Sequence, residues 1–173
     1  FTYHEDSETG QLIISGMGEL HLDVLVTRMK DDFGVQCRVG APQVTYREAV
    51  TSSADCTESF SKVLGGKENT AGITVHIEPR EQGAGNSYSC TVRDNNIPEE
   101  IYEAVENGFR SSLDSGINYG YPCTDTAVTV TGITYSEETA TTFAFEACAA
   151  QAFDKVCNMA SPQLLEPVMN VDI

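Results

Sequence analysis

The sequence predicts an α+β fold in which helices pack against a sheet, and three observations predict this class. Residues 72–79 alternate between apolar and polar side chains, which is typical of a half-buried strand. Residues 101–113 carry apolar side chains at every fourth position, which places them along one face of a helix. From residue 43 onward the predicted order is strands, helix, strand, helix and strand, an arrangement typical of helices that cover a sheet.

Residues 1–39 are predicted to form two short strands, a helix and a third strand. Residues 19–33 carry apolar side chains at spacings of three and four, so they are predicted to form a helix that ends at Gly34. The predicted strands are residues 1–3, 11–15 and 35–39. Four short elements are too few for an independent hydrophobic core, so we interpret residues 1–39 as half of a domain.

A second region begins after residues 40–42 (Gly-Ala-Pro), where glycine and proline favour a domain boundary. Its predicted strands are residues 43–50, 57–64, 72–79, 87–93 and 123–131. One predicted helix begins at Pro98, since proline is favoured in the first turn. Another covers residues 142–158, and Pro162 closes the region. A last strand is predicted over residues 168–173.

Composition and charge exclude several classes of function. Of the 173 residues, 40% are hydrophobic, and no window approaches the roughly 18–20 apolar residues of a membrane helix. Residues 1–6 contain neither a basic segment nor an apolar core and do not begin with Met, so we expect a piece of a longer protein without a signal peptide. The net charge of −16 argues against a general RNA-binding surface, although a few loop residues can still make a local contact.

The six cysteines indicate neither a disulfide framework nor a zinc site. No two of them form a C-x-x-C pair, and none has a histidine at the spacing of zinc ligands. We therefore expect reduced thiols that are mostly buried and serve as small apolar residues. Reduced cysteines fit a cytoplasmic protein, so we expect that localisation.

The sequence offers no case for catalysis by this chain. It lacks the phosphate-binding motif G-x-x-x-x-G-K-[ST], the dinucleotide-binding motif G-x-G-x-x-G and the nucleophile motif G-x-S-x-G. His4, His21 and His76 lie in separate predicted elements, so no triad is indicated. The acidic pairs at residues 99–100 and 137–138 are adjacent in sequence and do not face each other. We predict no catalytic, cofactor-binding or metal-binding residue.

Four strings of residues, in order along the chain, are similar to translation elongation factor G. They are GQLIISGMGELHLDV at residues 10–24, VGAPQVTYRE at 39–48, GYP at 120–122 and LLEPVM at 164–169. The first resembles a long contiguous motif of the family's third domain. The others resemble the start of domain IV, a run inside that domain and the passage into domain V. Other translational GTPases share the first string more loosely, and the last string favours elongation factor G.

The resemblance implies a division into three segments. Residues 1–39 correspond to the second half of domain III, which is ferredoxin-like in the family. Residues 40–163 correspond to domain IV, with the fold of domain 2 of ribosomal protein S5, and residues 164–173 correspond to the first strand of domain V. In the family, domain IV enters the decoding-side A site during translocation of the tRNA–mRNA pair, and the first domain hydrolyses GTP.

The same resemblance implies which partners to expect. They are the ribosome, through its rRNA and the tRNA–mRNA pair in the A site, and the other domains of the parent factor, with no membrane. Because the GTPase domain is not part of this chain, we expect no enzyme activity and no cofactor here. GTP and Mg²⁺ are expected in the full-length parent.

The resemblance also places two loops at the tip of domain IV, residues 65–69 and residues 134–139. The glycine pair in the first loop allows a tight turn that approaches RNA closely, and two lysines nearby can meet phosphate. From the residues alone, an ordinary surface hairpin is the simpler interpretation. The candidate ribosome- and tRNA-contacting residues are Lys62, Gly65, Gly66, Lys67, Tyr135, Ser136, Glu137 and Glu138.

Both loops depart from the pattern of the family. The first usually contains more glycine, glutamine and basic residues, where this chain has Asn-Thr-Ala-Gly at residues 69–72. The second usually has a histidine after its tyrosine, where this chain has Ser136, which is shorter, uncharged and unable to stack. Three hypotheses stay open: a translocating elongation factor G, a divergent paralogue that acts in ribosome recycling or does not translocate, and a generic acidic interaction domain.

Overall fold

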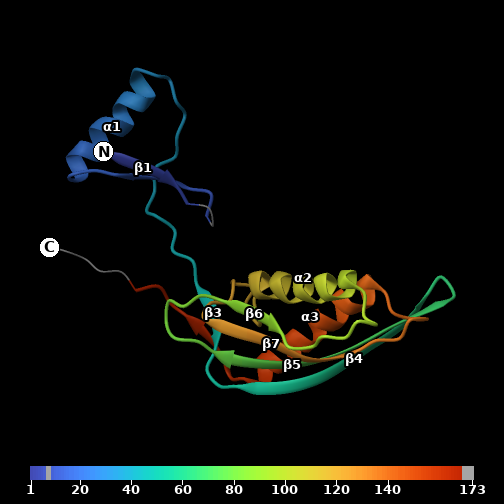
Figure 1. Cartoon of the computed structure of the whole chain (residues 1–173). Helices are drawn as coiled ribbons and strands as arrows, with labels where there is room; N and C mark the ends of the chain where they lie inside the picture. Colours follow the sequence, from blue (N-terminus) through green and yellow to red (C-terminus); the bar gives the residue numbers. More distant parts are fainter. Residues whose placement is uncertain (7–8, 169–173) are drawn as a thin grey trace. The chain divides into compact units, whose positions relative to one another are not determined.

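The computed structural model describes residues 1–6 and 9–168 and divides into two compact units, residues 1–45 and residues 46–173. We refer to them as unit 1 and unit 2 and describe each by itself (Figure 1). The strand predicted over residues 168–173 lies outside the described residues, except for Val168, which is not in a strand.

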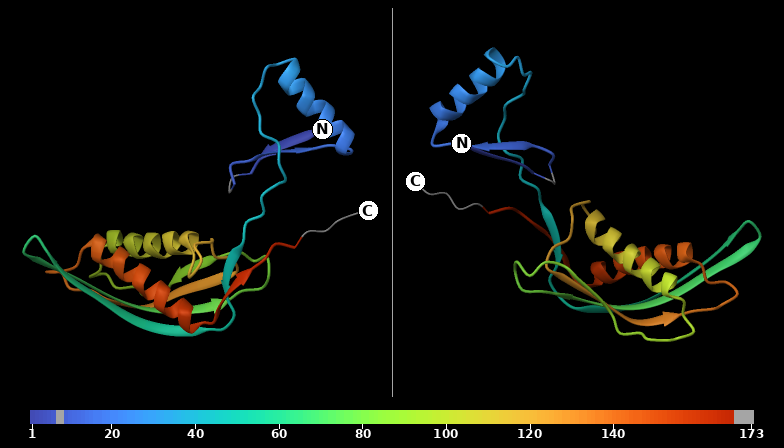
Figure 2. Two further views of the ribbon diagram at one scale, coloured as in Figure 1. Left: turned by 180° about the vertical axis from the view of Figure 1, so that it is seen from behind. Right: turned by 45° about the horizontal axis from the view of Figure 1, so that its top comes forward.

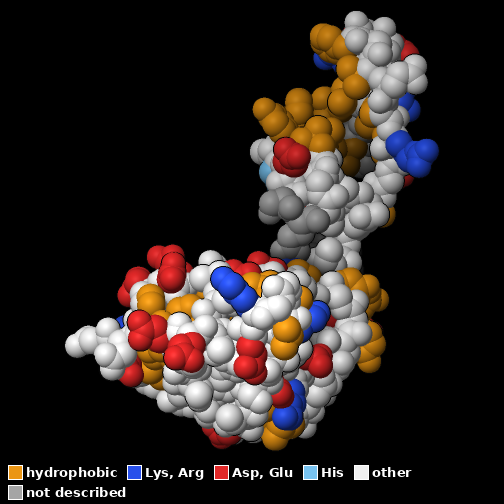
Figure 3. Space-filling view, turned by 90° about the vertical axis from the view of Figure 1, so that its right-hand side faces the viewer, with side chains coloured by type: hydrophobic (Ala, Val, Ile, Leu, Met, Phe, Trp, Pro, Cys, Tyr) orange, Lys and Arg blue, Asp and Glu red, His pale blue; other side chains and the backbone are white. Residues whose placement is uncertain are grey.

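Unit 1 contains a two-stranded antiparallel sheet and one helix. β1 (Thr2–Glu5) pairs with β2 (Leu12–Ser15), and α1 (Glu19–Asp31) follows. None of the 13 residues of α1 is buried, so unit 1 has little hydrophobic core of its own. Figure 3 shows apolar side chains gathered on the surface of this unit.

The prediction of a strand over residues 35–39 is wrong. As predicted, Gly34 ends the helical segment, with a φ of +65°. The Val35 N–H then donates to the Met29 carbonyl at 2.9 Å. Residues 35–39 then continue without a hydrogen-bonded neighbouring strand within the described part of the chain. A strand needs such a neighbour because its backbone N–H and C=O groups must find partners.

Unit 2 is built around a four-stranded sheet with two helices on one face (Figure 2). In order across the sheet, the strands are β4 (Ala54–Leu64), β5 (Lys67–Pro79), β7 (Thr126–Thr134) and β6 (Ser87–Cys90). β6 and β7 are parallel and joined through α2 (Glu99–Ser115), and the other neighbours are antiparallel. α3 (Thr142–Met159) leads to β8 (Pro162–Leu165), which pairs with β3 (Arg47–Val50) in a separate sheet. The prediction of a mixed fold of helices and sheet is confirmed.

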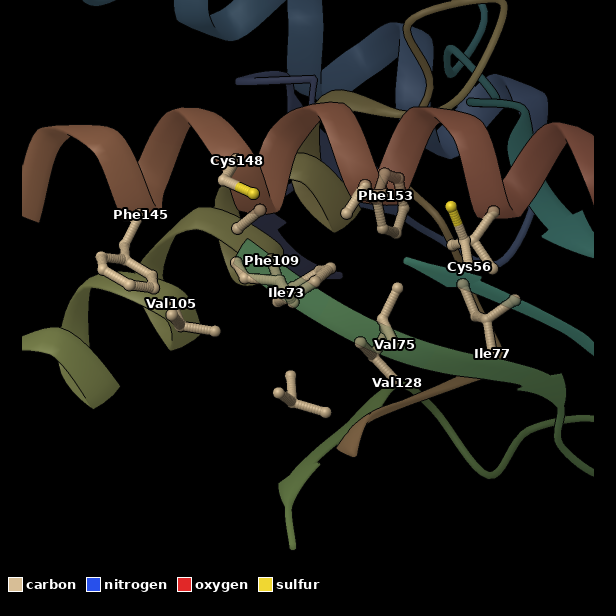
Figure 4. Packing of buried hydrophobic residues seen from close by; sticks show 14 of the residues in the cluster. Cys56, Ile73, Val75, Ile77, Val105, Phe109, Val128, Phe145, Cys148 and Phe153 are labelled. Carbon is tan, nitrogen blue, oxygen red and sulfur yellow. The ribbon is translucent and has the colours of Figure 1, made fainter. Parts of the chain in front are cut away.

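The hydrophobic core of unit 2 lies between the sheet and the helices (Figure 4). Ile73, Val75 and Ile77 of β5 are 0–1% exposed, as the alternation of residues 72–79 predicts. Phe109 of α2 and Phe153 of α3 are buried in the same cluster. Each such side chain contributes roughly 1.5–3 kcal/mol when fully buried, so this layer is the main source of stability in the unit.

The strands of unit 2 differ from the predictions mainly at their ends. β4 and β5 are longer than predicted, because their register continues from Ala54 opposite Ile77 to Leu64 opposite Lys67 as one long hairpin. β7 begins three residues later than predicted, after Asp125, whose φ of +52° is incompatible with a strand. β3 and β6 are shorter than predicted, at four residues each.

Pro162 does not close the region as predicted but begins β8. It stands opposite Val50 at the first position of the strand, where a missing N–H is tolerated. The sequence prediction therefore missed β8 entirely. Both helices of unit 2 lie where they were predicted. α2 ends at Ser115 with Gly116 as its C-cap, and α3 extends one residue further than expected.

Four cysteines of unit 2 are buried, which confirms the prediction that the thiols are mostly buried: Cys56, Cys123, Cys148 and Cys157. Burial raises the pKa of the Cys123 thiol to about 12 and that of Cys148 to about 11, so both are inert thiols at neutral pH. Within residues 1–6 and 9–168, no helix is long and apolar enough to cross a membrane. In the same residues, no group of three or more His, Cys, Asp or Glu side chains is placed to hold a metal ion.

Candidate functional site

The first predicted tip loop is the turn of the long β4–β5 hairpin. Figure 1 shows this hairpin extending past the ends of the two helices. Gly65 and Gly66 form the turn at φ values of +58° and +79°, a left-handed conformation that glycine adopts without strain. Lys62 and Lys67 lie on either strand next to this turn, and both are exposed.

The second predicted tip loop, between β7 and α3, lies beside the base of this turn. The Thr70 N–H donates to the Thr139 carbonyl at 2.9 Å, and Thr70 also forms a parallel β-bridge with Ala140. The hydroxyl groups of Thr70 and Thr139 are hydrogen-bonded to each other. The two loops, which are about 70 residues apart in the sequence, therefore form one structure, which we call the tip.

Asn69 lies at the centre of the tip and is only 9% exposed. Its side-chain N–H₂ donates to the carbonyls of Lys62 and Lys67, at 3.4 and 3.1 Å. Its side-chain oxygen accepts from the Thr141 hydroxyl at 3.0 Å. The Thr141 hydroxyl oxygen in turn accepts from the Ala144 N–H at 3.2 Å and so caps the N-terminus of α3.

The eight predicted contact residues all lie on these two loops or on the strands that bear them. Tyr135 is half-buried against the edge of the core, whereas Ser136, Glu137 and Glu138 are exposed. The Ser136 carbonyl accepts from the N–H groups of Thr139 and Ala140, at 3.2 and 2.8 Å, which folds the loop into a turn. The side chains that join the loops are Asn69, Thr70, Thr139 and Thr141. Asn69 and Thr139 lie within the predicted loops, but none of the four was among the candidate contact residues. The signal for Thr141 was available, because threonine directly before a helix is a common N-cap.

The tip carries charges of both signs on an acidic molecule. The two loops and the strands that bear them carry exposed lysines, Lys62 and Lys67, and exposed glutamates, Glu68, Glu137 and Glu138. Figure 3 shows Asp and Glu side chains spread over this face of unit 2, with a few Lys and Arg among them. Within the tip, Lys62 and Lys67 are the positively charged side chains, so any attraction to phosphate there is local.

The base of unit 2 is organised around a buried carboxylate, that of Glu48, which is 1% exposed. It accepts hydrogen bonds from the backbone N–H groups of Asn118, Tyr119 and Tyr121, at 2.7, 3.0 and 3.1 Å. Gly116 is required beside it, since a Cβ there would lie 2.5 Å from Glu48 Oε1. Three donors satisfy the carboxylate, which would otherwise be costly to bury.

This base brings together three of the four strings that resemble elongation factor G. Glu48 belongs to the second string, and its N–H donates to the carbonyl of Pro122 in the third, at 3.1 Å. Glu48 also pairs with Leu164 of the fourth string in the β3–β8 sheet. The strings are thus parts of one physical junction and not separate similarities.

Comparison with protein families agrees with this arrangement. Residues 42–161 match the family described as Elongation factor G, domain IV, and residues 1–41 match Elongation Factor G, domain III. The chain belongs to the elongation factor G family.

Relatives in this family cover the whole of the chain. It is 53% identical over 182 residues to Elongation factor G 1 of Treponema denticola, and 49% identical over 181 residues to Elongation factor G 2 of Treponema pallidum. The alignments include 100% of this chain but only 27% and 26% of those relatives. The chain therefore spans about a quarter of the length of the elongation factor G relatives that it matches.

A solved structure shares the fold of this elongation factor G family member. A crystal structure of a protein from Thermus thermophilus superposes with a TM-score of 0.76 at 29% identity, over 94% of this chain and 24% of that one. The resemblance to elongation factor G inferred from the four strings is confirmed.

Proposed function

We propose that this chain is the ribosome-contacting segment of a translational GTPase, elongation factor G, that promotes translocation of tRNA and mRNA. In this proposal residues 1–39 are the second half of a ferredoxin-like domain III, and residues 40–163 are domain IV with a fold like domain 2 of ribosomal protein S5. Residues 164–173 begin domain V. The full-length parent acts in the cytoplasm and binds GTP and Mg²⁺ through a domain that is not part of this chain.

One observation carries the proposal: the two loops are joined into a single tip at the end of a long hairpin. Thr70 and Thr139 link them through backbone and hydroxyl groups. A narrow tip that projects beyond the helices can enter a confined site, and the glycine pair at its end allows a close approach to RNA. The tip would reach into the decoding-side A site, where Lys62 and Lys67 would contact phosphate groups. The second loop would face the tRNA–mRNA pair through Tyr135, Ser136, Glu137 and Glu138.

The proposal is tested by measuring single-turnover translocation on 70S ribosomes with the full-length parent protein. We expect the double variant Lys62→Ala/Lys67→Ala to translocate more slowly, because the tip loses its two phosphate contacts. The matched control is Arg110→Gln, which removes an exposed cation from α2 that pairs with Glu106 at 2.7 Å. A parent protein that binds ribosomes and translocates equally well with and without the two lysines would contradict the proposed role of the tip.

A second candidate function rests on Ser136. This exposed serine stands where the family usually has histidine, so the tip lacks a side chain that can stack or carry a positive charge. A divergent paralogue that binds ribosomes but acts in recycling, or does not translocate, would fit this difference. Poly-phenylalanine synthesis by the full-length parent separates the two functions: normal turnover excludes the paralogue, and turnover restored by Ser136→His supports it.

A further inference from the structure

We propose that Asn69 is a positioning residue that holds the two loops of the tip in one fixed arrangement relative to α3. The inference rests on the proposed function, because the two loops that Asn69 would hold together are the part of the molecule that would contact the ribosome. We call this connection between the two loops the coupling. It concerns a residue that makes no contact with RNA in this proposal and acts through the loops that do.

The first step is that both donors and the oxygen of the Asn69 amide are hydrogen-bonded within the tip. Its two N–H donors face the carbonyls of Lys62 and Lys67, and its oxygen faces the Thr141 hydroxyl. Only a primary amide offers two donors and an acceptor in this geometry. Because the side chain is 9% exposed, water replaces these bonds poorly if they are lost.

The second step is that the three partners belong to three different elements. Lys62 is on β4 and Lys67 is on β5, so the amide holds the two strands of the hairpin next to the glycine turn. Thr141 is the N-cap of α3 and ends the second loop. A displacement of the hairpin therefore has to break a bond to the second loop, to the start of α3, or to both.

The third step is that the tip is hydrogen-bonded to the start of α3, a helix that is packed in the core. Phe145 lies one turn after Thr141 and is 0% exposed in the core. The bonds from Asn69 to Thr141 and from Thr141 to Ala144 thus connect the hairpin to a helix that the core holds in place. Such fully satisfied buried networks rigidify the structure around them.

The test uses hydrogen-exchange mass spectrometry on the full-length parent with Asn69→Asp. Aspartate has the same size but sets a carboxylate oxygen against the carbonyls of Lys62 and Lys67. We expect amide exchange to rise about tenfold in both residues 64–70 and residues 135–141. Faster exchange in the hairpin alone, with the second loop unchanged, would overturn the proposal.

Asn86 provides a matched control for a merely structural effect. Its side chain also bridges two backbone groups, donating to the Cys123 carbonyl at 2.8 Å and accepting from the Thr126 N–H at 3.2 Å. We expect Asn86→Asp to leave exchange in both tip loops unchanged. If it raised exchange there as much as Asn69→Asp does, the effect would be general loosening and the coupling would be refuted.

Function is tested separately with Thr141→Ser and Thr141→Val. Serine keeps the hydroxyl, so we expect exchange and single-turnover translocation near those of the wild type, whereas valine loses both bonds and should slow translocation several-fold. If valine loosens both loops but translocation is unchanged, the coupling stands and its role in translocation is refuted. If the wild-type parent does not translocate at all, the proposed function is refuted. The hydrogen-exchange result would still show whether Asn69 couples the two loops.

Discussion

At the scale of single residues, polar side chains that bind backbone groups position most of the irregular segments. Asp125 is an example at the edge of the main sheet, where its carboxylate accepts from the N–H groups of Gly83 and Gly85 at 3.0 and 2.8 Å. These two hydrogen bonds favour the ionised form, so they hold the pKa of Asp125 below its ordinary value of 3.8. The residue thereby ties the loop before β6 to the start of β7.

The lowered pKa of Asp125 predicts an acid-dependent contribution to stability. A carboxyl group whose pKa is lower in the folded state stabilises fully above its unfolded pKa, and this contribution disappears as the pH falls through the folded pKa. We expect Asp125→Asn, which keeps the left-handed backbone tolerance, to be destabilising at pH 7 and nearly neutral at strongly acidic pH. Urea denaturation over this pH range gives the measurement.

Asp114→Asn, at an exposed position of α2, is the control for the loss of one negative charge. If Asp114→Asn destabilised the protein at pH 7 as much as Asp125→Asn does, the effect would come from the lost charge and not from the two hydrogen bonds. A destabilisation by Asp125→Asn that stays constant down to strongly acidic pH would show that the two hydrogen bonds do not favour the charged carboxylate.

At the scale of elements, the two helices of unit 2 cross closely at Gly108. A Cβ placed there would lie 2.7 Å from the Ala149 Cβ and 3.1 Å from the Glu146 carbonyl oxygen. Glycine inside a helix is unfavourable by itself, so its presence is explained by this contact between α2 and α3.

The close crossing predicts that Gly108→Ala destabilises the protein although alanine favours helices. Overpacking costs roughly 1–3 kcal/mol and the higher helix propensity of alanine offsets about 1 kcal/mol, so we expect the free energy of unfolding to fall by up to roughly 2 kcal/mol. Chemical denaturation measures it. The double variant Gly108→Ala/Ala149→Gly should recover part of the loss, and strict additivity of the two changes would exclude the contact as its cause.

Elements with a strong apolar pattern were predicted from the sequence, and elements defined by a distant partner were not. α2, α3 and the central part of β5 follow from their own periodicity. β8 depends on pairing with β3, and the outer half of the β4–β5 hairpin depends on its register, so neither is visible locally. The predicted strand at residues 35–39 failed for the converse reason, because it has the composition of a strand but no neighbour in the described part of the chain.

The same limit applies to the candidate site. The turn at Gly65 and Gly66 was predicted because glycine pairs favour turns, and the family pattern supplied the second loop. Asn69 was placed in the first loop without a role of its own, and its side-chain oxygen binds Thr141, which is 72 residues away. A polar side chain whose partners are distant in sequence carries no local signal of its role.

At the scale of the whole molecule, the charge of −16 limits how the chain can meet an RNA-rich partner. In the proposed function, an acidic surface repels phosphate, so this chain's contact with RNA would depend on the few cations of the tip and on shape. Long-range electrostatic attraction between this chain and RNA phosphate would therefore contribute little to the affinity.

The two tip lysines predict a defined contribution of this chain to the salt dependence of ribosome binding. Each phosphate contact contributes a slope of about −0.7 to the dependence of log K on log salt for single strands, so Lys62→Ala/Lys67→Ala should reduce its steepness by roughly 1.4. Equilibrium binding of the full-length parent to 70S ribosomes at several KCl concentrations and constant Mg²⁺ gives the slopes. Arg110→Gln should leave the slope unchanged, and equal slopes for all three proteins would place the phosphate contacts elsewhere.

The pairing of β3 with β8 also has a consequence for how unit 2 is made in the cell. β3 is completed by residues 162–165, the last strand within the described residues, so the base cannot close until the chain through residue 165 has left the exit tunnel. The loop donors for Glu48 at residues 118–121 emerge earlier, so the nascent chain can form that junction first. A pause in synthesis before residue 162 would therefore leave β3 exposed as an open edge, a state in which chaperones are most needed.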